Sequence, residues 1–151
     1  MALRQIRIDD DPILRKKTRK IEEITPRIRE LAQDMLDTMY NADGVGLAAP
    51  QVGVLKQLVV IDVGDGPLVM INPEIKETEG SVVEEEACLS FPGMFGKVER
   101  PERVVAEYTD LEGNQCQVEG TGLVARAICH ELDHLAGIVY VDKATDIEVE
   151  V

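Results

Sequence analysis

Aromatic side chains are scarce in this chain of 151 residues: tryptophan is absent, and Phe and Tyr together make up 3% of the sequence. The hydrophobic fraction is nevertheless 44%, so a core must be packed mainly by Val, Ile, Leu, Met and Ala. Histidine is also rare, with two copies in the whole chain. The positions of these two histidines are therefore informative about any site that needs imidazole.

Long apolar runs are absent as well. None approaches the roughly 20 residues of a membrane-spanning helix, and the first ten residues lack the apolar core of a signal peptide. Basic residues are in deficit, with 16 Lys and Arg against 29 Asp and Glu and a net charge of −13. Because phosphate groups are bound by clustered cations, we expect no direct nucleic-acid partner and no anionic membrane partner. The excess of acid is interpreted as a contribution to solubility.

The three cysteines, Cys88, Cys116 and Cys129, form no Cys-x-x-Cys pair, and their number is odd. A reduced, cytoplasmic setting follows as the expectation. The length suits one domain over residues 1–151, large enough to bury roughly 70% of its unfolded surface.

Hydrophobic periodicity predicts an α+β fold with short, largely antiparallel sheets packed around helices. Residues 1–24 are expected to form a solvated, extended arm, followed by a helix over 26–41 with Thr25 as its N-cap and Pro26 in its first turn. The predicted strands are 56–63, 68–71, 74–79, 103–109, 115–119, 138–141 and 147–151. Residues 64–67 and 110–114 have the composition of hairpin turns.

A second helix is predicted over residues 121–136, with Thr121 as its cap and Gly137 as its stop, and this helix holds both histidines. His130 and His134 are four residues apart and lie on one face, while Glu131 lies about 100° round the helix. The pattern His-Glu-x-x-His allows the two imidazoles to bind one metal ion and the glutamate to reach a bound water. The pattern alone leaves open the alternative of two ordinary histidines on a helix face.

A third ligand is needed to complete a catalytic metal site. Cys129 points away from the histidine face, and Cys116 lies in a predicted hairpin strand. Cys88 follows an acidic run and precedes a turn, and by composition alone it is a small buried residue like the others.

Three ordered motifs resemble the peptide deformylase family. They are Gly44-Val45-Gly46-Leu47-Ala48-Ala49-Pro50-Gln51, Glu86-Ala87-Cys88-Leu89-Ser90 and His130-Glu131-Leu132-Asp133-His134, which match Gly-x-Gly-Leu-Ala-Ala-x-Gln, Glu-Gly-Cys-Leu-Ser and His-Glu-x-Asp-His. The resemblance implies that Cys88, His130 and His134 bind one divalent metal ion. Iron(II) is the expected ion, and zinc, nickel or cobalt can replace it.

The resemblance also implies a reaction. Such enzymes hydrolyse the N-formyl group of the formyl-methionine that begins nascent polypeptides, and they release formate. Glu131 would be the general base and acid. The side-chain amide of Gln51 and the backbone N–H of Leu89 would stabilise the oxyanion.

The substrate would add as a strand beside Gly44, Val45 and Gly46, with Glu86 and Ala87 on its other side. The methionine pocket is expected to be lined by Val45, Leu123, Ala127 and the stem of Glu86, although Leu123 and Ala127 also suit a helix core. Arg100 and Asp133 are candidates for support of the metal ligands, with surface pairing as the alternative.

Two positions depart from the family pattern: Ala87 replaces a glycine, and Cys129 replaces a glutamine. Ala87 adds a methyl group where glycine would permit close approach or positive φ. The fourteen residues after Gly137 alternate acidic and apolar side chains. We therefore expect a closing strand there, and any ribosome association is not expected to use a basic C-terminal helix.

Two rival hypotheses about the function are also compatible with the sequence. A His-Glu-x-x-His endopeptidase would take its third ligand after the helix, from Asp142, Asp146, Glu148 or Glu150. The other rival is a metal-stabilised binding module without activity, or a deformylase relative silenced at Ala87.

Overall fold

The computed structural model describes residues 2–150, which contain two α-helices, eight strands and three short 3₁₀ helices. The helices are α1 (Pro26–Asn41) and α2 (Leu123–Leu135), and the 3₁₀ helices are η1 (Pro12–Arg15), η2 (Ala49–Val52) and η3 (Tyr140–Asp142). The strands are β1 (Gly46–Ala48), β2 (Leu58–Ile61), β3 (Leu68–Glu79), β4 (Val82–Cys88), β5 (Phe91–Arg100), β6 (Arg103–Thr109), β7 (Gln115–Thr121) and β8 (Thr145–Val149). None of these helices is both long and apolar enough to span a membrane.

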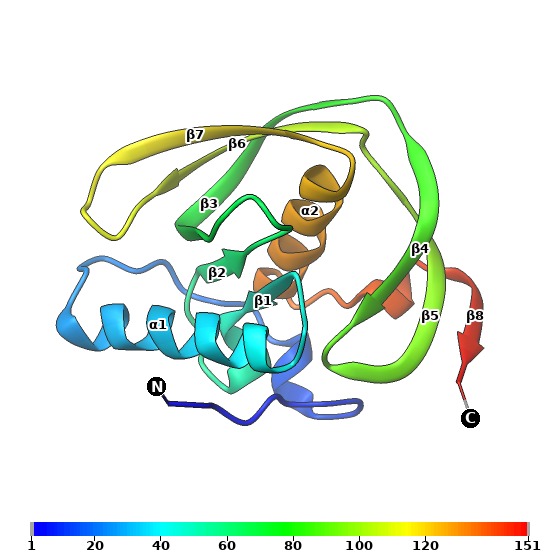
Figure 1. The fold of residues 1–151 in the computed structure, drawn as a ribbon, viewed down its shortest axis with the longest axis horizontal. Helices are drawn as coiled ribbons and strands as arrows, with labels where there is room; N and C mark the ends of the chain where they lie inside the picture. Colours follow the sequence, from blue (N-terminus) through cyan, green and yellow to red (C-terminus); the bar gives the residue numbers. More distant parts are fainter. Residues whose placement is uncertain (1, 151) are drawn as a thin grey trace.

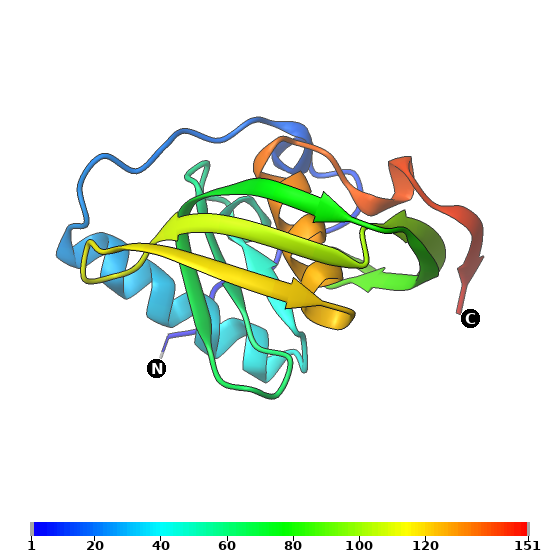
Figure 2. The same ribbon diagram turned by 90° about the horizontal axis from the view of Figure 1, so that it is seen from above.

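The strands form two antiparallel sheets, as Figures 1 and 2 show. The five-stranded sheet has the order β1-β2-β3-β6-β7, and the three-stranded sheet has the order β4-β5-β8. The predicted turns at residues 64–67 and 110–114 join β2 to β3 and β6 to β7. This arrangement confirms the predicted α+β class. Strands β1 and β4 each lie at the edge of a sheet, so each has an unpaired side.

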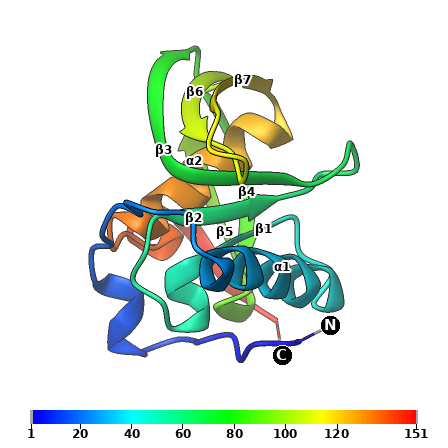
Figure 3. The ribbon, with the colours of Figure 1, turned by 90° about the vertical axis from the view of Figure 1, so that its left-hand side faces the viewer.

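Strands β1 and β2 are buried on both faces because a helix packs on each side of them (Figure 3). Leu47, Leu58 and Val60 belong to the hydrophobic cluster that includes the apolar face of α1. Their neighbours Ala48 and Val59 belong to the cluster that includes α2. Alternation along a strand thus places successive residues in two cores and holds α2 against the middle of the molecule.

Helix α1 begins as predicted. The Thr25 hydroxyl accepts a hydrogen bond from the backbone N–H of Ile28, and Pro26 occupies the first turn. Met35 and Met39 are fully buried within the core, which agrees with their interpretation as core residues. The bounds 26–41 are confirmed.

Two details at the ends of α2 differ from prediction. The N-cap is Gly122, whose φ of 58° is a turn conformation that glycine adopts freely, and Thr121 instead ends β7, paired with Arg103. Residues 138–141 form no strand: the chain enters η3, where the carbonyl of Tyr140 accepts hydrogen bonds from the backbone N–H groups of Lys143 and Ala144. Gly137, with φ 76°, ends the helix region as expected.

Other predictions were incomplete. Strands β4 and β5 were not predicted, and the two strands expected over 68–79 are one strand with a register shift after Ile71. The described part of the predicted arm, residues 2–24, is extended for most of its length, but it is not simply solvated. Leu14 and Ile21 are buried, and the backbone N–H of Arg7 donates to the carbonyl of Gln51.

Candidate active site

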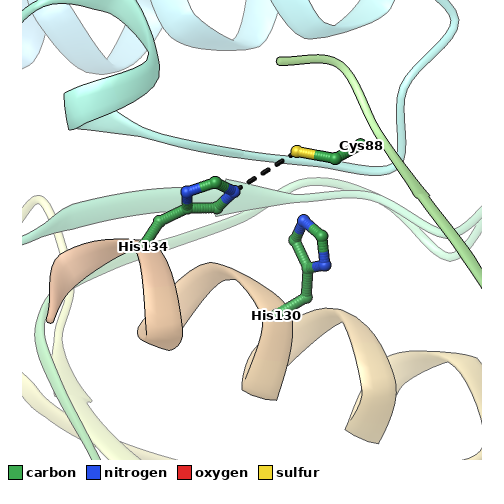
Figure 4. Close-up of side chains that lie close together, drawn as sticks. All are labelled: Cys88, His130 and His134. Carbon is green, nitrogen blue, oxygen red and sulfur yellow. Dashed lines mark hydrogen bonds between the residues drawn. The ribbon is translucent and has the colours of Figure 1, made fainter. Parts of the chain in front are cut away.

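Three side chains from two distant segments meet beside α2. Cys88 ends β4, and a tight turn pairs it with Phe91 at the start of β5. The Cys88 Sγ lies 3.3 Å from Nε2 of His134, and Figure 4 shows His130 one turn away on the same helix face. One donor atom from each of Cys88, His130 and His134 lies within 4.8 Å of the others, and all three residues are buried.

This donor set fits a divalent cation. His130 Nδ1 lies 2.8 Å from a carboxylate oxygen of Glu86, which leaves Nε2 to face the centre. Burial lowers the pKa of His134 to about 3, so its imidazole is in the neutral form that binds metals. A thiolate and two imidazoles suit zinc or iron, and three protein ligands leave one position open.

The acidic residues that could have supplied a different third ligand do not join this group. Within residues 2–150, the set of Cys88, His130 and His134 contains none of the four acidic candidates after α2. Asp142 instead pairs with Arg15, at 2.8 Å. The geometry therefore favours the cysteine set over that of the endopeptidase hypothesis.

Glu86 lies behind His130 with its carboxylate inside the protein. Its Oε1 accepts from Nη2 of Arg100 at 3.0 Å and its Oε2 from Nε at 2.8 Å, while Oε2 also accepts from Nη1 of Arg126 at 2.6 Å. Burial opposes ionisation, but the hydrogen bonds from His130 and Arg100 prevail and lower the pKa of Glu86 to about 2. Glu86 is thus a charged partner of the histidine, a contact that the sequence did not reveal.

Arg100 and Asp133 interact with each other. Arg100 Nη1 donates to the Asp133 carboxylate at 2.7 Å, and Lys143 lies 2.9 Å from the same oxygen. Arg100 is buried and reaches His130 through Glu86, whereas Asp133 is partly exposed. Both candidates for ligand support therefore belong to one chain of contacts that leads to His130.

Glu131 is buried beside the centre. Burial raises the pKa of its carboxyl to about 7. Its Oε1 has no hydrogen-bond partner within the described part of the chain, so an acceptor is left available. A side chain at Gly46 would collide with Oε2, because an added Cβ would lie 2.5 Å away. Glycine at position 46 therefore makes room for this carboxylate.

Gln51 is fixed in η2 with almost no exposure. Its Oε1 accepts from the backbone N–H of Ala48 at 2.9 Å, which orients the amide so that Nε2 donates to Ser90 Oγ at 3.0 Å. Nε2 also lies 3.5 Å from Cys88 Sγ. The amide donor is thus held at the candidate centre, and Leu89 follows Cys88 in the turn of the hairpin.

A cleft of about 440 Å³ opens beside these groups. Its lining includes every predicted substrate residue: Gly44, Val45, Gly46, Glu86, Ala87, Leu123 and Ala127. It also includes Gln51, Cys88, Leu89, His130 and Glu131, while His134 lies behind them. Val45 and Leu123 are 42% and 52% exposed, so apolar surface faces solvent in the cleft.

The family described as polypeptide deformylase matches residues 3–150. The chain belongs to the peptide deformylase family. Among curated relatives, peptide deformylase 1 of Clostridium acetobutylicum is 57% identical over 148 residues, covering 98% of this chain and 99% of that protein. Peptide deformylase of Caldicellulosiruptor bescii is 56% identical over 143 residues, covering 95% and 86%.

Solved peptide deformylase structures have the same fold. The enzyme of Thermotoga maritima superposes with a TM-score of 0.93 at 40% identity, covering 96% of this chain and 99% of that one. The Ehrlichia chaffeensis enzyme, in complex with actinonin, gives a TM-score of 0.94 at 36% identity, with coverage of 97% and 91%. Enzymes of this family are metal-dependent hydrolases, and the present chain is one of them.

The two departures from the family motifs are tolerated by this backbone. Ala87 is exposed on β4 and is not among the residues with positive φ, so its methyl group causes no backbone strain. Cys129 is buried within the α2 cluster, and burial raises the pKa of its thiol. The sequence patterns assign no role to Ser90 or Arg126, although Arg126 lies four residues before His130 and so on the same face of α2.

Proposed function

We propose that this peptide deformylase removes the N-formyl group from formyl-methionine at the start of nascent polypeptides in the cleft between β1 and β4, and that formate is released there. The observation that carries this assignment is the convergence of Cys88, His130 and His134 beside the buried carboxylate of Glu131. Residues 1–151 would form one catalytic domain.

Cys88, His130 and His134 would hold the metal ion, with iron(II) as the proposed ion and zinc, nickel or cobalt as substitutes. A divalent cation in such a site supplies a nucleophile at neutral pH by lowering the pKa of a coordinated water to about 7. Glu86 orients the His130 ring through Nδ1. Gln51 Nε2 contacts Cys88 Sγ and donates to Ser90 Oγ, which fixes the amide beside the candidate thiolate ligand.

Glu131 would take a proton from the attacking water and deliver it to the leaving amine nitrogen. A pKa near 7 suits both transfers, because the group can exist in either form at neutral pH. The formyl oxygen becomes negative as the bond to carbon forms. Gln51 Nε2 and the backbone N–H of Leu89 would donate to it, each with a contribution of about 3 kcal/mol.

The peptide backbone would lie between the free edges of β1 and β4. Gly44, Val45 and Gly46 would pair with one side of it, and Glu86 and Ala87 would border the other. Main-chain hydrogen bonds are common to all sequences, so this mode suits an enzyme that acts on many nascent chains. Val45, Leu123, Ala127 and the stem of Glu86 would receive the methionine side chain.

A cytoplasmic location agrees with three free cysteines and with the site of translation. The described segment after α2 ends in the acidic strand β8, so we propose no ribosome contact through a basic helix in that segment. Neither nucleic acid nor membrane is proposed as a direct partner.

The test is formate release from formyl-Met-Ala-Ser by anaerobically purified, metal-loaded enzyme. Glu131→Gln should lower kcat by about 10²- to 10⁴-fold while the protein still retains its metal. Glu30→Gln, an exposed glutamate of α1, is the matched control and should leave kcat unchanged. Unaltered formate release by Glu131→Gln would contradict the proposed base. In a second arm, Cys88→Ala should lose the metal.

A further inference from the structure

Arg126 is a buried cation that the proposed reaction does not use. Its side chain lies in α2, and the residue is only 6% exposed. Nη1 donates to Glu86 Oε2 at 2.6 Å and to the carbonyl of Val98 at 2.9 Å, and Nη2 donates to the carbonyl of Val82 at 2.9 Å. One guanidinium therefore makes three hydrogen bonds within the protein.

These partners lie on elements other than the helix that carries Arg126. Val82 and Glu86 belong to β4, and Val98 belongs to β5. Helix α2 supplies His130 and His134, whereas β4 ends at Cys88. Arg126 thus joins the two elements from which the three candidate ligands come, one helical turn before His130.

Arg126 is also connected to the candidate ligand His130 through the Glu86 carboxylate. Arg126 bonds one oxygen of the Glu86 carboxylate, and the other oxygen contacts His130 Nδ1 at 2.8 Å. Arg100 holds the same carboxylate, but it comes from β5 and reaches α2 through the side chain of Asp133. Arg126 is therefore the arginine of α2 that bonds this carboxylate directly, beside the His130 contact and the route through Arg100 and Asp133.

We propose that Arg126 is a positioning residue, which fixes the β4–β5 hairpin on α2 and so sets how firmly Cys88, His130 and His134 together retain the cation. The inference rests on the ligand set given under the proposed function. Arg126 has no part in proton transfer. Its effect reaches the metal through Glu86 and through the placement of the end of β4.

Two substitutions of Arg126 separate the contribution of its positive charge from that of its several hydrogen bonds. Arg126→Met fills similar space but removes one of the donors to Glu86 and the side-chain donor to both carbonyls. Arg126→Lys restores a single charged donor and cannot reproduce the planar fork. Arg103→Met is the matched control, because Arg103 also bridges strands by ion pairs with Glu77, Glu79 and Glu119, but on the exposed side of the large sheet.

The experiment uses cobalt(II)-loaded protein. The sulfur-to-cobalt charge-transfer absorption reports the bond to Cys88, and the rate of cobalt loss to an excess of chelator reports retention. We expect loss to be about tenfold faster in Arg126→Met, at the lower end of the effects of outer partners of metal-binding histidines, with a shifted absorption band. Arg126→Lys should fall between the wild type and Arg126→Met. Arg103→Met should match the wild type.

Wild-type kinetics and spectrum in folded Arg126→Met would overturn the inference. If Arg126→Met does not fold, Arg126→Lys decides in the same way: unchanged cobalt loss overturns the inference, and faster loss supports it. A lower melting temperature of the metal-free protein with unchanged cobalt loss would mean a merely structural role. Absence of the charge-transfer band from the wild type would instead refute the ligand set itself, so the two failures are distinguishable.

Discussion

Substitution of Gly46 by alanine tests the close approach of β1 to Glu131, the proposed general base. The added Cβ would lie 2.5 Å from Glu131 Oε2 and 3.0 Å from its Cδ, where ordinary contact begins at 3.4 Å. The carboxylate would have to retreat by about 0.9 Å, and the buried, closely packed Glu131 side chain has little room to do so. A misplacement of about 1 Å costs roughly 10²-fold in rate, equivalent to about 2.7 kcal/mol in the activation free energy.

The assay is kcat for formyl-Met-Ala-Ser hydrolysis at equal metal content. Gly46→Ala should lower kcat about 100-fold without loss of metal, because the atoms nearest to the added Cβ belong to Glu131, which is not a candidate ligand. Gly120→Ala is the control: its Cβ would meet Val124 Cγ1 at the same 2.5 Å, and neither Gly120 nor Val124 lines the cleft. That variant should lose stability but keep its kcat. If kcat of Gly46→Ala stayed within twofold of the wild type, the assigned position of Glu131 would be refuted.

Three further predictions concern stability. Thr25→Ala removes the N-cap bond to Ile28, so urea unfolding should show a loss of about 1 kcal/mol, and unchanged unfolding would rule out the cap. Met35→Ala empties a fully buried position and should cost about 2–5 kcal/mol in the same measurement, whereas a smaller loss would mean that the core collapses around the site. Removal of the metal by a chelator should lower the melting temperature, since ligand at 100 times its Kd stabilises by about 2.7 kcal/mol, and readdition of the metal should restore it. Equal melting temperatures with and without the metal would argue against a metal ion that links β4 to α2.

Local signals in the sequence predicted much of the fold. The bounds of α1 followed from Thr25, Pro26 and an apolar stripe, and those of β6 followed from a run of strand-forming residues. The hairpin turns were also predictable, since glycine and acidic residues marked them. In each of these cases the chemistry that sets the structure lies within a few neighbouring residues.

The parts of the fold that were not predicted depend on contacts between segments distant in sequence. Strand β4 was missed because three successive glutamates, at 84–86, suggest solvent exposure, yet Glu86 is buried by two arginines from β5 and α2. The end of β7 was missed because Thr121 resembles a cap, although pairing with Arg103 holds it in the sheet. Neither the arginine partners of Glu86 nor the strand partner of Thr121 can be assigned from local sequence.

The candidate site, like the fold, was predictable from local sequence only in part. The spacing of His130 and His134 predicted a shared helix face, but spacing could not choose Cys88 over the other cysteines; the family resemblance made that choice. The roles of Arg126 and Ser90 depend on side-chain geometry across elements, and they emerged only from the structure.

Anomalous diffraction from crystals of the metal-loaded protein, recorded at the absorption edge of the bound ion, tests the central claim most directly. The account predicts one strong peak at bonding distance, about 2.0–2.3 Å, from Cys88 Sγ and from one ring nitrogen each of His130 and His134. A peak coordinated by acidic side chains that follow α2, with the Cys88 sulfur outside bonding distance, would contradict it.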